Sequence, residues 1–197
     1  ARIVVYGDIP SEEYLSFLHD EFLSRFERQD PIPPPAKQPR WSEPRRRETT
    51  YPLEGVTDLS ERSSVTLNWL LFPVTDARRV VDAAVLSEIL LGHSGSPLSR
   101  ALLESGLGQD LSPVLGLETD LAEAVFSVGL RGTDVNHEEA IQELILSTLR
   151  TLVTEGIHAE AVEGALRRVE FSNREIKGGP NGMRVMRRAL RGWMYGA

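Results

Sequence analysis

The stretch SVTLNWLLFP, residues 64–73, decides the fold. It predicts a strand because its side chains alternate between two faces with a period of two. One face carries Val65, Leu67, Trp69 and Leu71, and the other carries Thr66, Asn68, Leu70 and Phe72. Pro73 ends the strand, because proline cannot continue a backbone ladder.

Two helices, two strands and three further helices are predicted downstream of this strand. Helices are predicted over residues 76–91 and 96–104, separated by the glycine-rich turn at 92–95. Strands at 111–118 and 122–131 follow, joined by a link short enough for an antiparallel hairpin. Three further helices are expected, the first capped by Asn136 and closed by Gly156, and the last capped by Asn181 after the break at 178–180.

Upstream, the chain changes character twice. Residues 3–6 predict a short buried strand, and Ser11 is expected to cap a helix that ends near Gln29. Residues 30–63 hold seven of the chain's 12 prolines and predict an extended strap. We expect Trp41 and Tyr51 to pin this strap, with one edge strand at 46–52.

The order of elements predicts the fold class. Consecutive strands followed by grouped helices are typical of an α+β fold, here a mainly antiparallel sheet with helices packed on one face.

Composition excludes several classes of function. The net charge of -7 argues against nucleic acid as a partner, and no apolar run approaches the roughly 20 residues that span a membrane. The absence of cysteine excludes disulfides and thiolate metal sites. The C-terminal stretch from Gly164 is basic, but Phe171 is the one aromatic residue between its first and last arginines, too few for base stacking, so we expect a solvated face that meets another part of a larger protein.

No catalytic or metal site is visible in the sequence. The four histidines, His19, His93, His137 and His158, form neither His-x-x-x-His nor His-x-x-Glu-His. We expect His137-Glu138-Glu139 to be a solvated helix start. The chain has no Gly-x-Ser-x-Gly elbow, and the glycines at 178–182 lack the Gly-Lys-Ser/Thr ending of a phosphate loop.

Seven segments occur in the order found in a known family. They are Val5-Tyr6-Gly7-Asp8-Ile9-Pro10, residues 38–45 (QPRWSEPR), residues 65–71 (VTLNWLL), residues 90–98 with Leu-Leu-Gly and Ser-Pro-Leu, residues 101–108 (ALLESGLG), Gly129-Leu130-Arg131-Gly132, and residues 191–196 (RGWMYG). In this order they resemble the presequence protease branch of the insulinase-type zinc metallopeptidases, the inverted zincins. The resemblance covers nearly the whole chain.

The resemblance implies a domain division. Residues 1–29 would close the preceding catalytic repeat, residues 30–63 would be the connecting strap, and residues 64–197 would form the second, non-catalytic repeat. The zinc ligands would lie in the parent protein outside this chain, so the chain alone is expected to be inactive and to hold no metal. A start without methionine fits an excised fragment or a processed terminus.

The resemblance also implies a binding role. The partners would be a peptide substrate and the remaining domains of the same polypeptide, in the bacterial cytoplasm or an organellar matrix, with neither nucleic acid nor a membrane. A peptide exosite would match two segments: the turn Gly92, His93, Ser94, Gly95 and Ser96, and the strand Val114, Leu115, Gly116 and Leu117. Glycines let a foreign backbone come close, and strand addition gives affinity with little sequence demand.

Two alternatives stay open. Gly116 could instead be a bend in a hairpin and Gly95 a helix stop. The whole repeat could be purely structural, as in peptidase-like scaffold proteins without activity.

Overall fold

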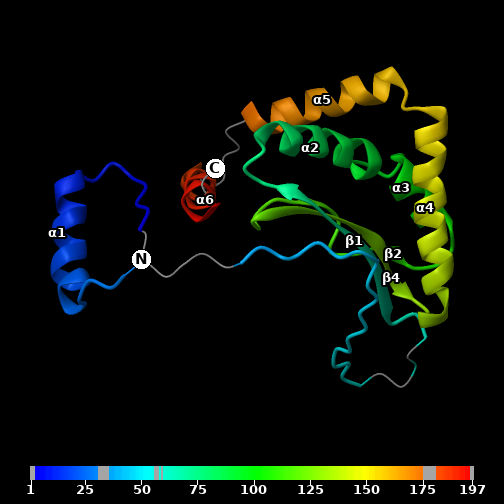
Figure 1. Cartoon of the computed structure of the whole chain (residues 1–197), viewed down its shortest axis with the longest axis horizontal. Coiled ribbons are helices and arrows are strands. Elements are labelled where there is room, and N and C mark those ends of the chain that lie inside the picture. Colours follow the sequence, from blue (N-terminus) through cyan, green and yellow to red (C-terminus); the bar gives the residue numbers. More distant parts are fainter. Residues whose placement is uncertain (1–2, 31–35, 56–57, 59, 175–180, 196–197) are drawn as a thin grey trace. The chain divides into compact units, whose positions relative to one another are not determined.

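The computed structural model describes residues 3–30, 36–55, 58, 60–174 and 181–195 (Figure 1). These residues form two compact units. One lies within Gln38–Glu175, and the other lies within Ala1–Lys37 and Ile176–Gly196. The repeat boundaries implied by the resemblance stay a prediction.

The larger unit is built on an antiparallel sheet. Its central strand is β4 (Glu123–Thr133), which pairs along its length with β1 (Ser63–Pro73). On its other side β4 pairs with β2 (Asp110–Leu111) and then with β3 (Gly116–Glu118). The sheet therefore has two outer edges, one formed by β1 and the other by β2 and β3.

Strand β1 confirms the reading of residues 64–73, with Ser63 added. The antiparallel hairpin before β4 is also confirmed, because Glu118 lies opposite Val125. The single strand expected over residues 111–118 is wrong, since the chain leaves the ladder between β2 and β3. Pro113 has no N–H to give to a ladder, and Gly116 has a φ of +83°, which a regular strand does not allow.

Helices cover one face of this sheet (Figure 1). They are α2 (Ala77–Leu91), α3 (Pro97–Glu104) and α4 (Glu138–Glu155). Their apolar sides meet those of β1 and β4 in one core, whose buried members are Leu90, Leu98, Leu102, Val128, Leu130, Ile141 and Ile145. Helix α5 (Ala159–Arg174) packs on α2 as a further layer through Ala165, Val85 and Ile89. The α+β class with helices on one face is confirmed.

Helix starts in the larger unit follow side-chain chemistry. Asp76 caps α2 by accepting from the N–H of Arg79 at 3.1 Å. The cap expected at Asn136 is wrong: Asp134 accepts from the Asn136 N–H and starts a 3₁₀ turn, Val135–His137, before α4. Gly156 ends α4 as expected, with a φ of +83°.

The smaller unit contains α1 (Ser11–Glu21), a 3₁₀ turn (Leu23–Arg25) and α6 (Asn181–Tyr195). Pro10, rather than Ser11, occupies the cap position of α1, with no side-chain cap. The strand expected at residues 3–6 is wrong: none of the described strands pairs with this segment, and the Tyr6 side chain is 63% exposed. A segment of four residues cannot form a strand without a partner ladder.

The strap is irregular over residues 36–55, so the edge strand expected at 46–52 is wrong. Side chains hold it in place of a backbone ladder. The Tyr51 hydroxyl donates to the Arg62 carbonyl, although its ring is 58% exposed. Trp41 is 49% exposed and stacks with the Arg45 guanidinium 4.9 Å from its ring centroid. Tyr51 therefore anchors the strap through its hydroxyl, as expected. Trp41 is half-exposed and does not hold the strap by burial. Residues 31–35 and 175–180, with their proline and glycine breaks, lie outside the described residues.

Candidate functional site

Strand β3 presents one backbone edge away from the sheet. The N–H groups of Gln109 and Ser112 donate to the carbonyls of Arg131 and Gly129. The odd-numbered residues of β4 therefore direct their backbone N–H and C=O groups toward β2 and β3. Gly116 and Glu118 lie opposite Ser127 and Val125 and turn their backbone groups toward β4. Hydrogen bonding alternates along an antiparallel strand, so Leu117 between them directs its N–H and C=O outward. No described strand pairs with that edge.

The side chain of Leu117 points out of the plane of the sheet, toward α2. It lines an apolar hollow of ≈ 220 Å³ together with Trp69, Leu71, Ala83, Leu86, Ser87, Leu90, Phe126 and Leu149. Within this hollow, the rings of Trp69 and Phe126 lie 6.0 Å apart. What Leu117 offers to the outside is therefore its backbone.

Gly116 makes the entry to β3 possible. Its positive φ lies in the left-handed region that side chains disfavour. A Cβ there would also lie 3.1 Å from Ser87 Oγ, so β3 runs tight against α2 at this point. The preceding residues Val114 and Leu115 are exposed. Both readings of Gly116 fit: it is a bend, and that bend brings an exposed backbone to the sheet edge.

The turn after α2 is closed by its own hydrogen bonds. The Ser96 N–H donates to the His93 carbonyl at 2.9 Å, and the His93 N–H donates to Ser96 Oγ at 3.2 Å. The Gly95 N–H donates to His93 Nδ1 at 3.1 Å. Ser96 is buried, whereas Gly92, His93, Ser94 and Gly95 are exposed. His93 thus shapes the turn.

The two predicted segments reach each other through α2. Gly116 meets this helix at Ser87, about one helical turn before the 92–95 turn begins. Among the described residues, no hydrogen bond joins 92–96 to 114–117. The structure therefore places both segments along one helix without merging them into a single site.

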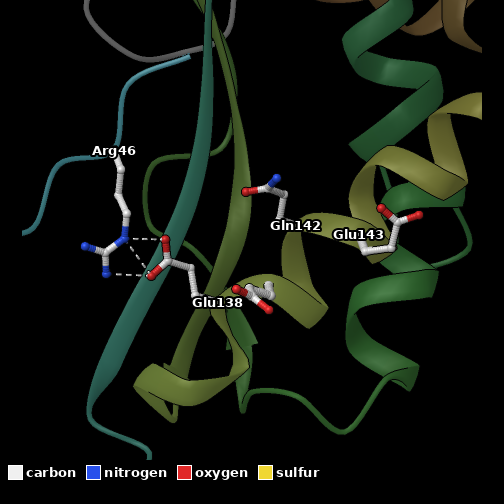
Figure 2. A pocket seen from close by; sticks show the side chains of 5 residues that line it. Arg46, Glu138, Gln142 and Glu143 are labelled. Carbon is white, nitrogen blue, oxygen red and sulfur yellow. Dashed lines mark hydrogen bonds and ion pairs between the residues drawn. The ribbon is translucent and has the colours of Figure 1, made fainter. Parts of the chain in front are cut away.

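A polar pocket was missed by the sequence analysis. It has a volume of ≈ 650 Å³ and is lined by Arg46 of the strap and by Glu138, Glu139, Gln142 and Glu143 of α4 (Figure 2). Arg46 Nε donates to Glu138 Oε1 at 2.7 Å, and its Nη2 donates to Oε2 at 2.8 Å. This hydrogen bond raises the pKa of Arg46 and lowers the pKa of Glu138. Glu138 stands at the start of α4, as expected for 137–139, but its carboxylate is paired with Arg46 and anchors the strap, which the sequence did not predict.

Arg46 could not have been found from local sequence patterns. It lies 92 residues before Glu138, among several arginines of similar context. Only packing of the strap against α4 selects it. His137 is likewise engaged, since its Nδ1 lies 3.2 Å from the Leu107 carbonyl oxygen.

Among the residues that the structure describes, no three His, Cys, Asp or Glu side chains converge on a position that could hold a metal ion. No described helix is both long and apolar enough to cross a membrane.

The sheet face away from the helices is lined with hydroxyl and amide groups. Thr66 Oγ1 lies 3.0 Å from Ser112 Oγ, above Gly129, which has no side chain to separate them. Ser127 Oγ donates to Asn68 Oδ1 at 2.7 Å. Ser112 and Ser127 are only 4% and 2% exposed, so these polar pairs are buried at the centre of the face.

Comparison with known proteins identifies relatives over most of the chain. It is 33% identical over 172 residues to the mitochondrial presequence protease of Xenopus tropicalis, covering 87% of this chain and 17% of that protein. It is 36% identical over 201 residues to presequence protease 1, chloroplastic/mitochondrial, of Arabidopsis thaliana, covering 99% of this chain and 18% of the relative. Protein HypA of Clostridium perfringens is 30% identical over 196 residues, 98% of this chain and 20% of that protein.

The chain thus spans at most a fifth of the length of these curated relatives. A family model described as the peptidase M16 inactive domain matches residues 1–169. The chain therefore belongs to the M16 peptidase family, as the inactive domain of a presequence protease-like protein.

Proposed function

We propose that this domain forms part of the wall of a peptide-degrading chamber and binds peptide by strand addition at the outer edge of β3. The observation that carries the proposal is the outward-facing backbone of Leu117, next to a glycine with a positive φ. An extended peptide can pair with such an edge through main-chain hydrogen bonds, whatever its side chains. This suits a protein that accepts many peptide sequences.

The polar sheet face supports the wall role. Its polar side chains pair across strands: the hydroxyls of Thr66 and Ser112 meet, and the Ser127 hydroxyl donates to the Asn68 amide oxygen. Ser112 and Ser127 are buried, so these pairs satisfy polar groups between the strands and stiffen the sheet as a wall.

Hydrolysis itself would belong to other parts of the intact protein. The names of two of these relatives contain the word protease, and the matched family model describes an inactive domain. We therefore assign zinc-activated water and its general base to another repeat of the same polypeptide. The partners of this domain would be that repeat and the peptide. Bacterial cytoplasm or an organellar matrix remains the proposed compartment.

The test is a pair of substitutions at Leu117 in the intact protein. Leu117→Pro removes the outward N–H, whereas the N–H groups that pair β3 with β4 belong to its neighbours. We expect about tenfold weaker binding of long peptides, as for the loss of one or two net hydrogen bonds. Peptides too short to reach from the catalytic repeat to β3 should be cleaved normally. Gly116→Pro is less clean, because proline cannot adopt the φ of +83° at that position.

Leu117→Ala is the matched control, since it shortens the side chain in the apolar hollow but keeps the N–H. It should bind long peptides as the unmodified protein does. Equal losses in both variants would assign the effect to packing, and no loss in Leu117→Pro would leave the purely structural role for this repeat.

A further inference from the structure

The two edges of the sheet differ in how their carbonyls are used. On β1, Val65, Leu67 and Trp69 lie opposite even-numbered residues of β4. These even-numbered residues direct their backbone N–H and C=O groups toward β1. The alternation of an antiparallel ladder then turns the backbone groups of Thr66, Asn68 and Leu70 outward. An incoming strand could pair with these groups as readily as with β3, so the sheet alone does not decide where a peptide adds.

Arg40 of the strap occupies the outer edge of β1. Its Nη1 donates to the Leu70 carbonyl and its Nη2 to the Leu71 carbonyl, both at 2.5 Å. Along the same edge, the Asn68 side-chain amide donates to the Thr66 carbonyl at 3.3 Å. Side chains thus occupy three edge carbonyls of β1, whereas no hydrogen bond from a described residue falls on the outward backbone of Leu117.

A buried carboxylate holds Arg40 in this position. Arg40 Nη2 lies 2.8 Å from Glu123 Oε1, and the Glu123 side chain is only 9% exposed. A buried charge is costly without a partner, so Glu123 fixes the guanidinium at the start of β4. The planar fork of arginine then spans two successive carbonyls, a geometry that the single ammonium of lysine cannot match.

The site lies at an irregularity of β1. The register with β4 shifts between Leu70 and Pro73, and there both Leu70 and Leu71 present carbonyls to the strap. Natural sheets protect exposed edges with bulges and with charged side chains. Here the charged side chain, Arg40, comes from another segment of the chain.

We propose that Arg40 closes the β1 edge to strand addition, so that a peptide can add to this sheet only at β3. This inference rests on the proposed binding by strand addition and names Arg40 as its positioning residue. The strap then has a role beyond connection: it determines which edge of the sheet binds peptide.

The experiment compares Arg40→Ala with Arg46→Ala in the intact protein. Arg46→Ala is the matched control, because it releases the strap from α4 at Glu138 but leaves the Arg40 contacts in place. The probe is a synthetic peptide of alternating threonine and lysine, about six residues long, the usual length of a strand. A chelator present throughout prevents cleavage of the probe. Amide hydrogen exchange then reports which edge the probe protects.

In the unmodified protein and in Arg46→Ala, the probe should slow exchange at Leu117 and leave Thr66, Asn68 and Leu70 unchanged. In Arg40→Ala, it should in addition slow exchange at these three β1 amides by about tenfold, as a new strand hydrogen bond would. In Arg40→Lys, the slowing of exchange at the three β1 amides should be smaller than in Arg40→Ala. Lysine still neutralises Glu123 but cannot bridge two carbonyls.

Arg40→Ala leaves Glu123 without its cation, so the double variant Arg40→Ala with Glu123→Gln separates edge opening from loss of fold. No new protection at β1 in either variant overturns the inference. If the probe protects β1 in Arg40→Ala but protects Leu117 in none of the proteins tested, Arg40 still closes the β1 edge. Peptide binding at the β3 edge would then be refuted. Protection of β1 in Arg46→Ala would assign closure to the strap as a whole and overturn the assignment to Arg40.

Discussion

Gly129 of β4 lies opposite Thr66 of β1 with no room for a side chain. A Cβ at this position would lie 1.9 Å from the Val65 carbonyl oxygen and 2.8 Å from Thr66 Cα. Both obstacles are backbone atoms of a paired strand, so they cannot move aside without opening the ladder. The missing side chain also lets Thr66 and Ser112 meet above it.

We therefore expect Gly129→Ala to lower the free energy of unfolding by roughly 1–3 kcal/mol, the usual cost of overpacking. Urea denaturation of the two proteins measures this difference. Gly164→Ala is the control, because Gly164 lies inside α5 and its new Cβ would meet only Arg168 Nη1 at 3.6 Å. It should stabilise by about 0.5–1 kcal/mol through helix propensity. Unchanged stability in Gly129→Ala would show that the two strands can separate freely.

At the scale of elements, the strap depends on individual side-chain anchors. Arg46 holds it to α4 through three hydrogen bonds to Glu138, which lower the pKa of that carboxyl (Figure 2). A carboxyl whose pKa is lowered in the folded state stabilises the fold, and this contribution is complete at pH values above the pKa of the unfolded state. That contribution is lost as the pH falls through the lower pKa of the folded state. The anchor should thus hold at neutral pH and release only in acid, below the ordinary titration range of glutamate.

Arg46→Ala should return the pKa of Glu138 toward its ordinary value, because the hydrogen bond from Arg46 is the main cause of the shift. A carbon-detected NMR titration of the side-chain carboxyls measures this. Asp110 serves as the internal control, since its lowered pKa comes from Arg131 and should not change. A Glu138 pKa that stays low in the variant would contradict the anchor.

For the whole molecule, we expect the purified chain to contain no stoichiometric zinc and to cleave no peptide. Zinc in proteins needs three or four converging ligands, and no such group exists among the described residues. Metal analysis after dialysis, together with a peptide cleavage assay, tests the expectation. One tightly held zinc per chain would refute it.

Residues 64–73 determined β1 because alternation with a period of two is a local property of the sequence. The same holds for α2 with its cap at Asp76 and for the end of α4 at Gly156. Local patterns were misleading where a partner decides the outcome. Residues 3–6 and 46–52 have strand-like composition, yet no described strand pairs with either.

The candidate site divides in the same way. The sequence by itself determined that glycines at 92, 95 and 116 let the backbone turn or lie exposed, because glycine has no Cβ to forbid it. Only the tertiary structure decided that Leu117 directs its backbone outward, since that follows from its register against β4. The contacts of Arg40 with Leu70 and Glu123 join residues 30 and 83 positions apart. Contacts at such separations leave no periodic trace in the sequence, so only the packed sheet reveals which of its edges is closed.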